Sequence, residues 1–360
     1  MNIYSQRISQ VRSLFDEWEV DALLLKSEAN RRWLSNFTGS SAWLLITSED
    51  AYLATDFRYW EQAQSQSPHF DLFKMERSDS IKELLQTVAG SRVALERKHL
   101  TLADFALLKE VEEIEWLPRE PTVEPLRAVK TADEVDAIRR SAAITDRVMQ
   151  MVPELARPGL TERELAWQME KRLREKGGDG IAFPVIVASG PNAALPHHRP
   201  GERTLRAGEV LLIDMGAVVD GYRSDMTRTF FLGDAPDDTF WEIYNLVLQA
   251  QSAALEALRP GLSGPEVDKI ARDVIGAQER ADQFGHGLGH GVGLEIHEDP
   301  PRLSPSGTGD PLQEGMVTSV EPGVYVPGWG GVRIEDLVAL TADGVDVLSQ
   351  CPKEPLIPAG

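Results

Sequence analysis

Cysteine and long apolar runs are nearly absent from this chain of 360 residues. Its single cysteine, Cys351, excludes an internal disulfide framework and fits a reducing compartment. No apolar run approaches the roughly 18–20 residues that a helix needs to span a bilayer. The first twenty residues contain no apolar segment followed by a small-residue cleavage site, so no secretory leader is expected. These absences predict a cytoplasmic protein without a membrane partner, in which Cys351 is inert.

Positive charge is also scarce, with 37 lysines and arginines against 57 aspartates and glutamates and a net charge of −20. Binding to phosphates requires a basic surface, so nucleic acid is not an expected partner. An acidic excess is usually a solubility feature. Carboxylates gathered around cations would also produce it, and charge alone does not separate the two explanations.

Residues 1–125 alternate between helix-like and strand-like segments and predict a smaller α/β domain. A polar helical stretch runs to about Glu19, and no metal-binding group or nucleophile stands out. We therefore expect a scaffold or oligomerisation domain. The expected strands lie at 21–25, 42–47, 50–55 and 91–96, and the second and third of these form a hairpin.

The second domain is expected to span 126–360. Pro121 and Pro125 interrupt regular structure at the boundary. Thr131 and Glu134 then form a capping box ahead of a run with helical apolar spacing. A long helix should therefore open this domain.

The second domain contains an internal repeat. The pattern Arg-Pro-Gly-Leu-Thr/Ser-x-x-Glu occurs at 157–164 and again at 259–266, each time as a turn that feeds a capped helix. A glycine followed by an acid six residues later also occurs twice, at 208–214 and 315–321. Chance similarity between short Pro/Gly motifs is the alternative. Two matches in the same order favour two halves related by an approximate two-fold axis, with a site at their junction.

The first half contains two aspartates near one turn. Asp220-Gly221 between apolar runs predicts a two-residue hairpin in which Asp214 faces Thr227. Asp225 is then the diagonal neighbour of Asp214 on the same face of the sheet. Two carboxylates on an apolar face repel each other and lose hydration unless a positive group lies between them. A metal ion fits this requirement, although a buried arginine or lysine could also meet it.

The second half repeats this arrangement with two glutamates. Residues 327–331 have the composition of a turn between two β-rich segments. Glu321 and Glu335 are equally far from Gly328, so a hairpin centred there places them opposite each other. Four converging carboxylates can hold two divalent cations.

Five of the seven histidines fall between positions 197 and 297. The segment 284–298 carries three of them and is too rich in glycine for an ordinary helix. One imidazole added to an oxygen-rich site suits Mn²⁺, Co²⁺ or Zn²⁺ better than Mg²⁺ or Ca²⁺. The five histidines of this region are His197, His198, His286, His290 and His297.

These motifs resemble the metallopeptidases of the pita-bread fold, the group that includes methionine aminopeptidase, aminopeptidase P and prolidase. The resemblance covers roughly 131–350. It rests on the aspartate pair eleven residues apart, the segment His286-Gly-Leu-Gly-His290, the Glu321-Pro-Gly motif, and the final glutamate after Val-Arg-Ile. It implies an α+β catalytic domain with an internal pseudo-two-fold axis, preceded by the smaller α/β domain.

The resemblance also implies a role for each matching residue. Asp214 would bind one divalent ion and His290 and Glu321 the other, while Asp225 and Glu335 would bridge the two ions. Mn²⁺ is the expected metal, with Co²⁺ or Zn²⁺ as alternatives. Glu321 would also accept a proton from the attacking water. His197 and His297 would contact substrate and stabilise the transition state, and His286 would line the same pocket. Arg333 matches an arginine near the last glutamate.

Within this group the flanking sequence is similar to that of the Xaa-Pro peptidases. The segments 36–41 and 55–63 resemble small two-domain aminopeptidase P enzymes more than prolidases. The expected activity is therefore hydrolysis of the bond between an N-terminal residue and a following proline in short peptides, by a homodimer. Prolidase activity on Xaa-Pro dipeptides is the main alternative. A metal-free creatinase-like reaction and a non-enzymatic binding protein are less compatible with five retained ligands.

Overall fold

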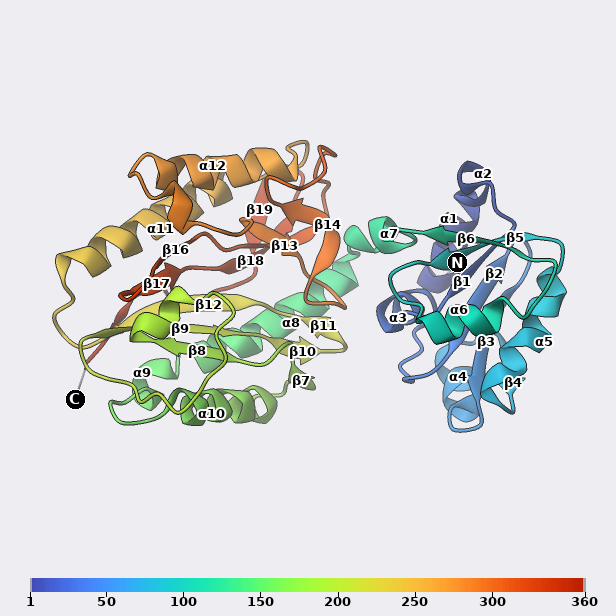
Figure 1. The fold of residues 1–360 in the computed structure, drawn as a ribbon, viewed down its shortest axis with the longest axis horizontal. Helices are drawn as coiled ribbons and strands as arrows, with labels where there is room; N and C mark the ends of the chain where they lie inside the picture. The colour runs from blue at the N-terminus through green and yellow to red at the C-terminus, as the bar shows by residue number, and fades with distance from the viewer. Residues whose placement is uncertain (1, 359–360) are drawn as a thin grey trace. The chain divides into compact units, whose positions relative to one another are not determined.

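The computed structural model describes residues 2–358 (Figure 1). The chain divides into two compact units, Met1–Arg127 and Ala128–Gly360. Among the described residues, no helix is both long enough and apolar enough to cross a membrane.

The first unit contains a six-stranded sheet with the order β4-β3-β2-β1-β5-β6. The predicted hairpin is confirmed, because β2 and β3 pair antiparallel, whereas the outer pairs β3–β4 and β5–β6 are parallel. The single helix predicted to about Glu19 is two helices, α1 and α2. The elements are α1 Ile3–Ser13, α2 Phe15–Trp18, β1 Ala22–Leu25, α3 Glu28–Ser35, β2 Trp43–Thr47, β3 Ala51–Asp56, α4 Trp60–Gln66, β4 Asp71–Met75, α5 Ile81–Leu85, β5 Arg92–Glu96, α6 Leu102–Leu108, β6 Glu115–Arg119 and α7 Glu124–Ala128.

The first half of the second unit begins with the predicted long helix. Thr131 accepts a hydrogen bond from the backbone of Glu134, whose side chain in turn accepts from Thr131. A long ladder of β9 with β12 and a short ladder of β10 with β11 then form one interrupted hairpin. The elements of this half are α8 Ala132–Met149, α9 Val152–Leu155, α10 Glu162–Glu175, β7 Gly180–Ile181, β8 Ile186–Ser189, β9 Glu209–Met215, β10 Ala217–Val219, β11 Tyr222–Arg223 and β12 Met226–Leu232.

The second half has a similar plan, in which the helices α11 and α12 precede an interrupted hairpin. Its ladders are β15 with β18 and β16 with β17. The elements are α11 Asp238–Ala257, α12 Gly264–Gly276, β13 Gly289–Gly291, β14 Glu298–Leu303, β15 Val317–Val320, β16 Gly323–Val326, β17 Gly330–Arg333, β18 Asp336–Leu340 and β19 Val345–Val347, with the short strand β20 Leu356–Ile357 near the end of the chain.

Corresponding positions of the two halves share the same local features, which confirms the internal two-fold. The helices α10 and α12 both begin with a capping box. The glycines that precede each acid, Gly208 and Gly315, share a φ of +84°, a conformation that favours glycine. Leu165 of α10 packs in one cluster with Leu211 of β9, and Val267 of α12 packs in another with Val320 of β15. The second cluster also contains Val210 of β9, so the two halves share a core. Figure 1 shows α11 and α12 on one side of these strands and α10 on the other.

Candidate metal centre

Asp214 and Asp225 lie at the break between the β9–β12 ladder and the β10–β11 ladder of the first hairpin. Asp214 in β9 pairs with Thr227 in β12, the register predicted from the Asp-Gly turn. The ladder breaks at Gly216, where a Cβ atom would lie 1.9 Å from the carbonyl oxygen of Ser224. Only glycine allows this close approach of two backbone segments. Asp225 follows the break and is buried.

The interruption of the second hairpin positions the two glutamates in the same way. The pairs Gly323–Arg333 and Val320–Asp336 belong to one continuous register, which confirms the predicted hairpin around Gly328. Glu321 and Glu335 occupy opposing positions between the two ladders. The Glu335 amide donates to the carbonyl of Thr227 at 3.1 Å, so the two hairpins meet at their breaks.

The structure brings the five predicted ligands together. His290 Nε2 lies 3.3 Å from Oε1 of Glu321 and 3.6 Å from Oδ2 of Asp225. Ligand atoms of Asp225, His290 and Glu335 all lie within 4.8 Å of one another. Asp214 joins the group through Arg333, whose Nη2 is 2.6 Å from its Oδ2 and whose Nε is 3.9 Å from Glu321.

The His290 ring is oriented for ligation. Its Nδ1 lies 3.0 Å from the carbonyl oxygen of Gly291. A carbonyl oxygen can only accept, so Nδ1 carries the proton and Nε2 presents its lone pair to the carboxylates. Burial lowers the pKa of His290 and keeps the imidazole neutral at neutral pH. This is the tautomer that metal-binding histidines use.

The carboxylates have too few positive partners. Among the described residues, Asp214 Oδ1 and Glu335 Oε1 are buried without a hydrogen bond. Burial, reinforced by the negative charge of neighbouring carboxylates, raises the pKa of Asp225 and of Glu335 well above the ordinary range. Arg333 is one cation against four carboxylates. The residues present therefore fit divalent cations, because an ion would engage the unpaired oxygens and relieve the repulsion.

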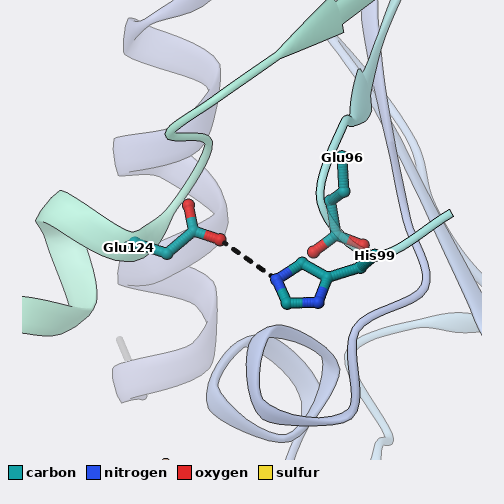
Figure 2. Close-up of side chains that lie close together, drawn as sticks. All are labelled: Glu96, His99 and Glu124. Carbon is teal, nitrogen blue, oxygen red and sulfur yellow. Dashed lines mark ion pairs between the residues drawn. The ribbon is translucent and has the colours of Figure 1, made fainter. Parts of the chain in front are cut away.

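A second group of potential ligands, Glu96, His99 and Glu124, lies in the first unit (Figure 2). Its carboxylates already have partners. Glu96 accepts from the backbone amides of Lys26 and Ser27 at the start of α3 and from the side chain of Asn30. Glu124 accepts from the same Asn30 amide at 2.8 Å and, through its other oxygen, from Thr122.

His99 completes this group at 3.9 Å from Glu124. No oxygen of either carboxylate is left unsatisfied, in contrast to the centre of the second unit. Hydrogen bonding accounts for the cluster without an ion. The sequence did not reveal it, because its members lie in β5, the following loop and α7.

Two of the remaining predicted histidines line the centre. The rings of His290 and His297 have centroids 4.1 Å apart. Burial, with smaller contributions from His290 and His197, lowers the pKa of His297 to about 4. His286 Nε2 lies 2.8 Å from the hydroxyl of Tyr325, and burial lowers its pKa as well. Both rings are therefore neutral at neutral pH.

His197 and His198 have different surroundings. His197 is exposed, but its charge influences the pKa of both His286 and His297, so it lies close to the centre. His198 turns to Glu162 instead, with 2.8 Å between Nε2 and Oε2. His198 is thus engaged by Glu162, and His197 remains the predicted site residue.

Sequence reasoning missed two hydroxyls. Tyr325 accepts from Arg333 Nη1 at 3.0 Å and connects it to His286. Thr227 accepts from Arg333 Nε at 3.0 Å and donates to Glu335 Oε2 at 2.8 Å. These bonds fix the orientation of Arg333 and Glu335. The predicted pairing of Thr227 with Asp214 was the only signal for either residue.

Comparisons with known proteins agree with this geometry. Residues 136–342 match the sequence model of metallopeptidase family M24, and residues 7–129 match that of the creatinase/prolidase N-terminal domain. The Xaa-Pro dipeptidase of Pyrococcus furiosus is 33% identical over 353 residues, which cover 97% of this chain and 99% of that protein.

Solved structures are equally similar. An Xaa-Pro dipeptidase from Bacillus anthracis superposes with a TM-score of 0.94 at 37% identity, covering 98% of this chain and 99% of the other. An X-Pro aminopeptidase from Thermotoga maritima superposes with a TM-score of 0.86 at 32% identity, covering 94% and 98%. The relatives therefore include both dipeptidases and aminopeptidases.

Proposed function

The chain belongs to metallopeptidase family M24, in its branch of Xaa-Pro peptidases with the pita-bread fold, and on this premise we propose that it hydrolyses the bond between an N-terminal residue and a following proline. The observation that carries the proposal is the convergence of four carboxylates and one neutral imidazole in which two buried oxygens lack partners.

The proposed cofactors are two divalent ions, with Mn²⁺ as the first choice. Asp214, Asp225, His290, Glu321 and Glu335 would hold these ions. The unpaired oxygens of Asp214 and Glu335 support these assignments, since each has a lone pair that no donor occupies. When bound, the ions supply Lewis acidity and lower the pKa of water toward neutrality.

The protein's own residues supply proton transfer and charge stabilisation. The Glu321 carboxylate would accept a proton from the attacking water and return it to the proline nitrogen. His297 acts as a neutral donor toward the developing oxyanion, in keeping with its low pKa, and His197 is a second donor. Arg333 fixes Asp214, and Tyr325 fixes Arg333 and His286.

Two substrate ranges are compatible with this centre. Aminopeptidase P activity, on peptides longer than two residues, is favoured by the motifs at 36–41 and 55–63 of the first unit. Xaa-Pro dipeptidase activity is favoured by the full-length similarity to dipeptidases at 33% and 37% identity. We propose the first as the activity of this chain and retain the second as its competitor.

A pair of assays tests the proposal. The protein is stripped with a chelator, reconstituted with Mn²⁺, Co²⁺ or Zn²⁺, and supplied with Gly-Pro and with Gly-Pro-Ala. Faster cleavage of the tripeptide supports aminopeptidase activity, and cleavage of the dipeptide alone supports prolidase activity. Failure to cleave either peptide with any metal would overturn both.

The ligand assignment is tested by Glu335→Ala. We expect this variant to lose activity while it retains its fold, judged by circular dichroism. Elemental analysis of the reconstituted wild type should give about two metal ions per chain. Wild-type turnover in the variant, or one ion per wild-type chain, would contradict the dinuclear assignment.

A further inference from the structure

Residues 190–201, called the loop 190–201 below, form the first part of the connection from β8 to β9 and carry His197. It approaches the metal centre at two places. The carbonyl of Pro196 lies 3.5 Å from Arg333 Nη1. A Cβ atom added to Gly331 in β17 would lie 2.3 Å from the carbonyl oxygen of Ala193, so the loop is seated directly on that strand.

The other side of this loop is held by one carboxylate. Glu162, the first residue of α10, is fully buried. Its Oε1 accepts from the amide and the hydroxyl of Ser189, both at 2.8 Å, and from the Asn192 side chain at 3.0 Å. Its Oε2 accepts from His198 Nε2 at 2.8 Å and from the Gly201 amide at 3.4 Å. Both ends of the loop therefore depend on a single side chain.

The capping box of α10 does not require the Glu162 carboxylate. The capping box of α10 is closed by Thr161 and Glu164, which leaves Glu162 without a role in the cap. Burying a carboxylate is costly unless hydrogen bonds replace its hydration. A surface loop of this length could satisfy its polar groups with water. The donors are instead collected on one buried anion, which fixes the loop in a single conformation.

We propose that Glu162 and His198 are positioning residues that hold the loop 190–201 so that His197 faces the scissile carbonyl of a bound peptide. This proposal rests on the proposed function, because it assigns His197 to substrate. In this proposal Glu162 contacts neither metal nor substrate, and it affects catalysis only through the position of the loop and of His197. If Glu162 had only a structural role, its substitution would lower the stability of the protein, and the loss of activity would not depend on whether His197 is present.

A double-mutant cycle separates the two roles. The variants are Glu162→Gln, His197→Ala and their combination, assayed on the better of the two proline peptides with Mn²⁺. A displacement of about 1 Å can cost on the order of 10²-fold in rate, so Glu162→Gln should lower kcat/KM by roughly this factor. The combined variant should be no slower than His197→Ala alone, because the position of a missing side chain no longer matters.

Control measurements accompany the cycle. Glu164→Gln changes a carboxylate of the same helix that does not touch the loop, and it should leave kcat/KM unchanged. Mn²⁺ affinity, measured by calorimetry, should be the same in Glu162→Gln and wild type. His198→Gln replaces Glu162→Gln in the cycle if that variant fails to fold. Multiplicative losses in the double variant, or a weaker Mn²⁺ affinity, would overturn the proposal.

A readout without catalysis keeps this test separate from the proposed function. Hydrogen exchange of peptides covering 190–201 should be at least about tenfold faster in Glu162→Gln than in Glu164→Gln, since local opening becomes easier. If the wild type cleaves no proline peptide, the function is wrong and exchange still tests the anchoring. Equal exchange in the two variants would overturn the anchoring itself.

Discussion

Arg333 donates from Nη2 to Oδ2 of Asp214 across 2.6 Å, and this is the only hydrogen bond of that carboxylate within residues 2–358. The same guanidinium reaches Thr227 through Nε and Tyr325 through Nη1. One planar side chain therefore orients one proposed metal ligand directly and a second, Glu335, through Thr227.

Arg333→Lys should damage this arrangement despite keeping the charge. A lysine ammonium cannot reproduce the fixed fork that meets three partners in one plane. Loss of such an outer partner usually costs 10–100-fold in metal affinity or activity, and we expect a loss of about that size in Mn²⁺ affinity by calorimetry. Arg140→Lys, at an exposed ion pair with Asp220, is the matched control and should bind Mn²⁺ normally. Equal affinities in both variants would contradict the orienting role.

Glu335→Gln should stabilise the metal-free protein. Burial and neighbouring carboxylates raise the pKa of Glu335, so its ionised form is disfavoured in the folded state. The amide keeps an oxygen for Thr227 and removes the charge. A gain of about 1 kcal/mol would raise the Tm of a unit of this size by ~2–4 °C in the presence of a chelator at pH 8. With added Mn²⁺ the wild type should have the higher Tm, because only the wild type retains all five proposed ligands.

The pH dependence gives an internal check on that prediction. A carboxyl group whose pKa is raised on folding has no penalty below its ordinary pKa, and the penalty grows as the pH rises toward the folded value. The advantage of Glu335→Gln should therefore vanish near pH 4 and increase toward neutral pH. Glu256→Gln, on the exposed face of α11, should show no such trend. A constant difference across pH would mean that packing, not charge, separates the proteins.

The β-hairpins were predictable because their signals are local. The turn at Asp220-Gly221 determines the register of its strands, so the pairing of Asp214 with Thr227 follows from the sequence alone. The glycine-centred turn at Gly328 acts in the same way for Glu321 and Glu335. Side chains positioned by a turn within about fifteen residues are thus recoverable from sequence.

The supporting contacts were not predictable because they join segments far apart in the chain. Glu162 binds His198 across 36 positions, and no local pattern marks a glutamate that closes no cap. Tyr325 has the sequence context of any core aromatic residue, and only its contacts with His286 and Arg333 distinguish it. Tertiary packing determines these supporting contacts, and the hydrophobic periodicity of the sequence contains no information about which distant segments meet.

A buried ion pair offers a test of stability beside the site. Lys130 Nζ lies 2.9 Å from Glu298, next to His297, and both side chains are almost fully buried. Lys130→Met leaves a buried carboxylate without its cation, which typically costs about 3–5 kcal/mol. Urea unfolding should detect this loss, and Lys130→Met/Glu298→Gln should recover part of it. Lys269→Met, at an exposed pair with Asp273, should behave like the wild type.

Cys351 should be unreactive in the folded protein, as expected from its isolation in the sequence. Its side chain is buried, and burial is the main cause that raises the pKa of the thiol to about 11. Relative to a free thiol of pKa ~8.5, the thiolate at pH 8 is then on the order of 10²-fold less abundant, and the thiolate is the reactive form. An aromatic disulfide reagent should therefore label the native chain very slowly at pH 8. It should label one thiol per chain at once in guanidinium, because Cys351 is the only cysteine. The carbonyl of Cys351 accepts a hydrogen bond from Arg228, which ties this segment to the core. Rapid labelling of the native protein would contradict the prediction and show that the segment opens readily.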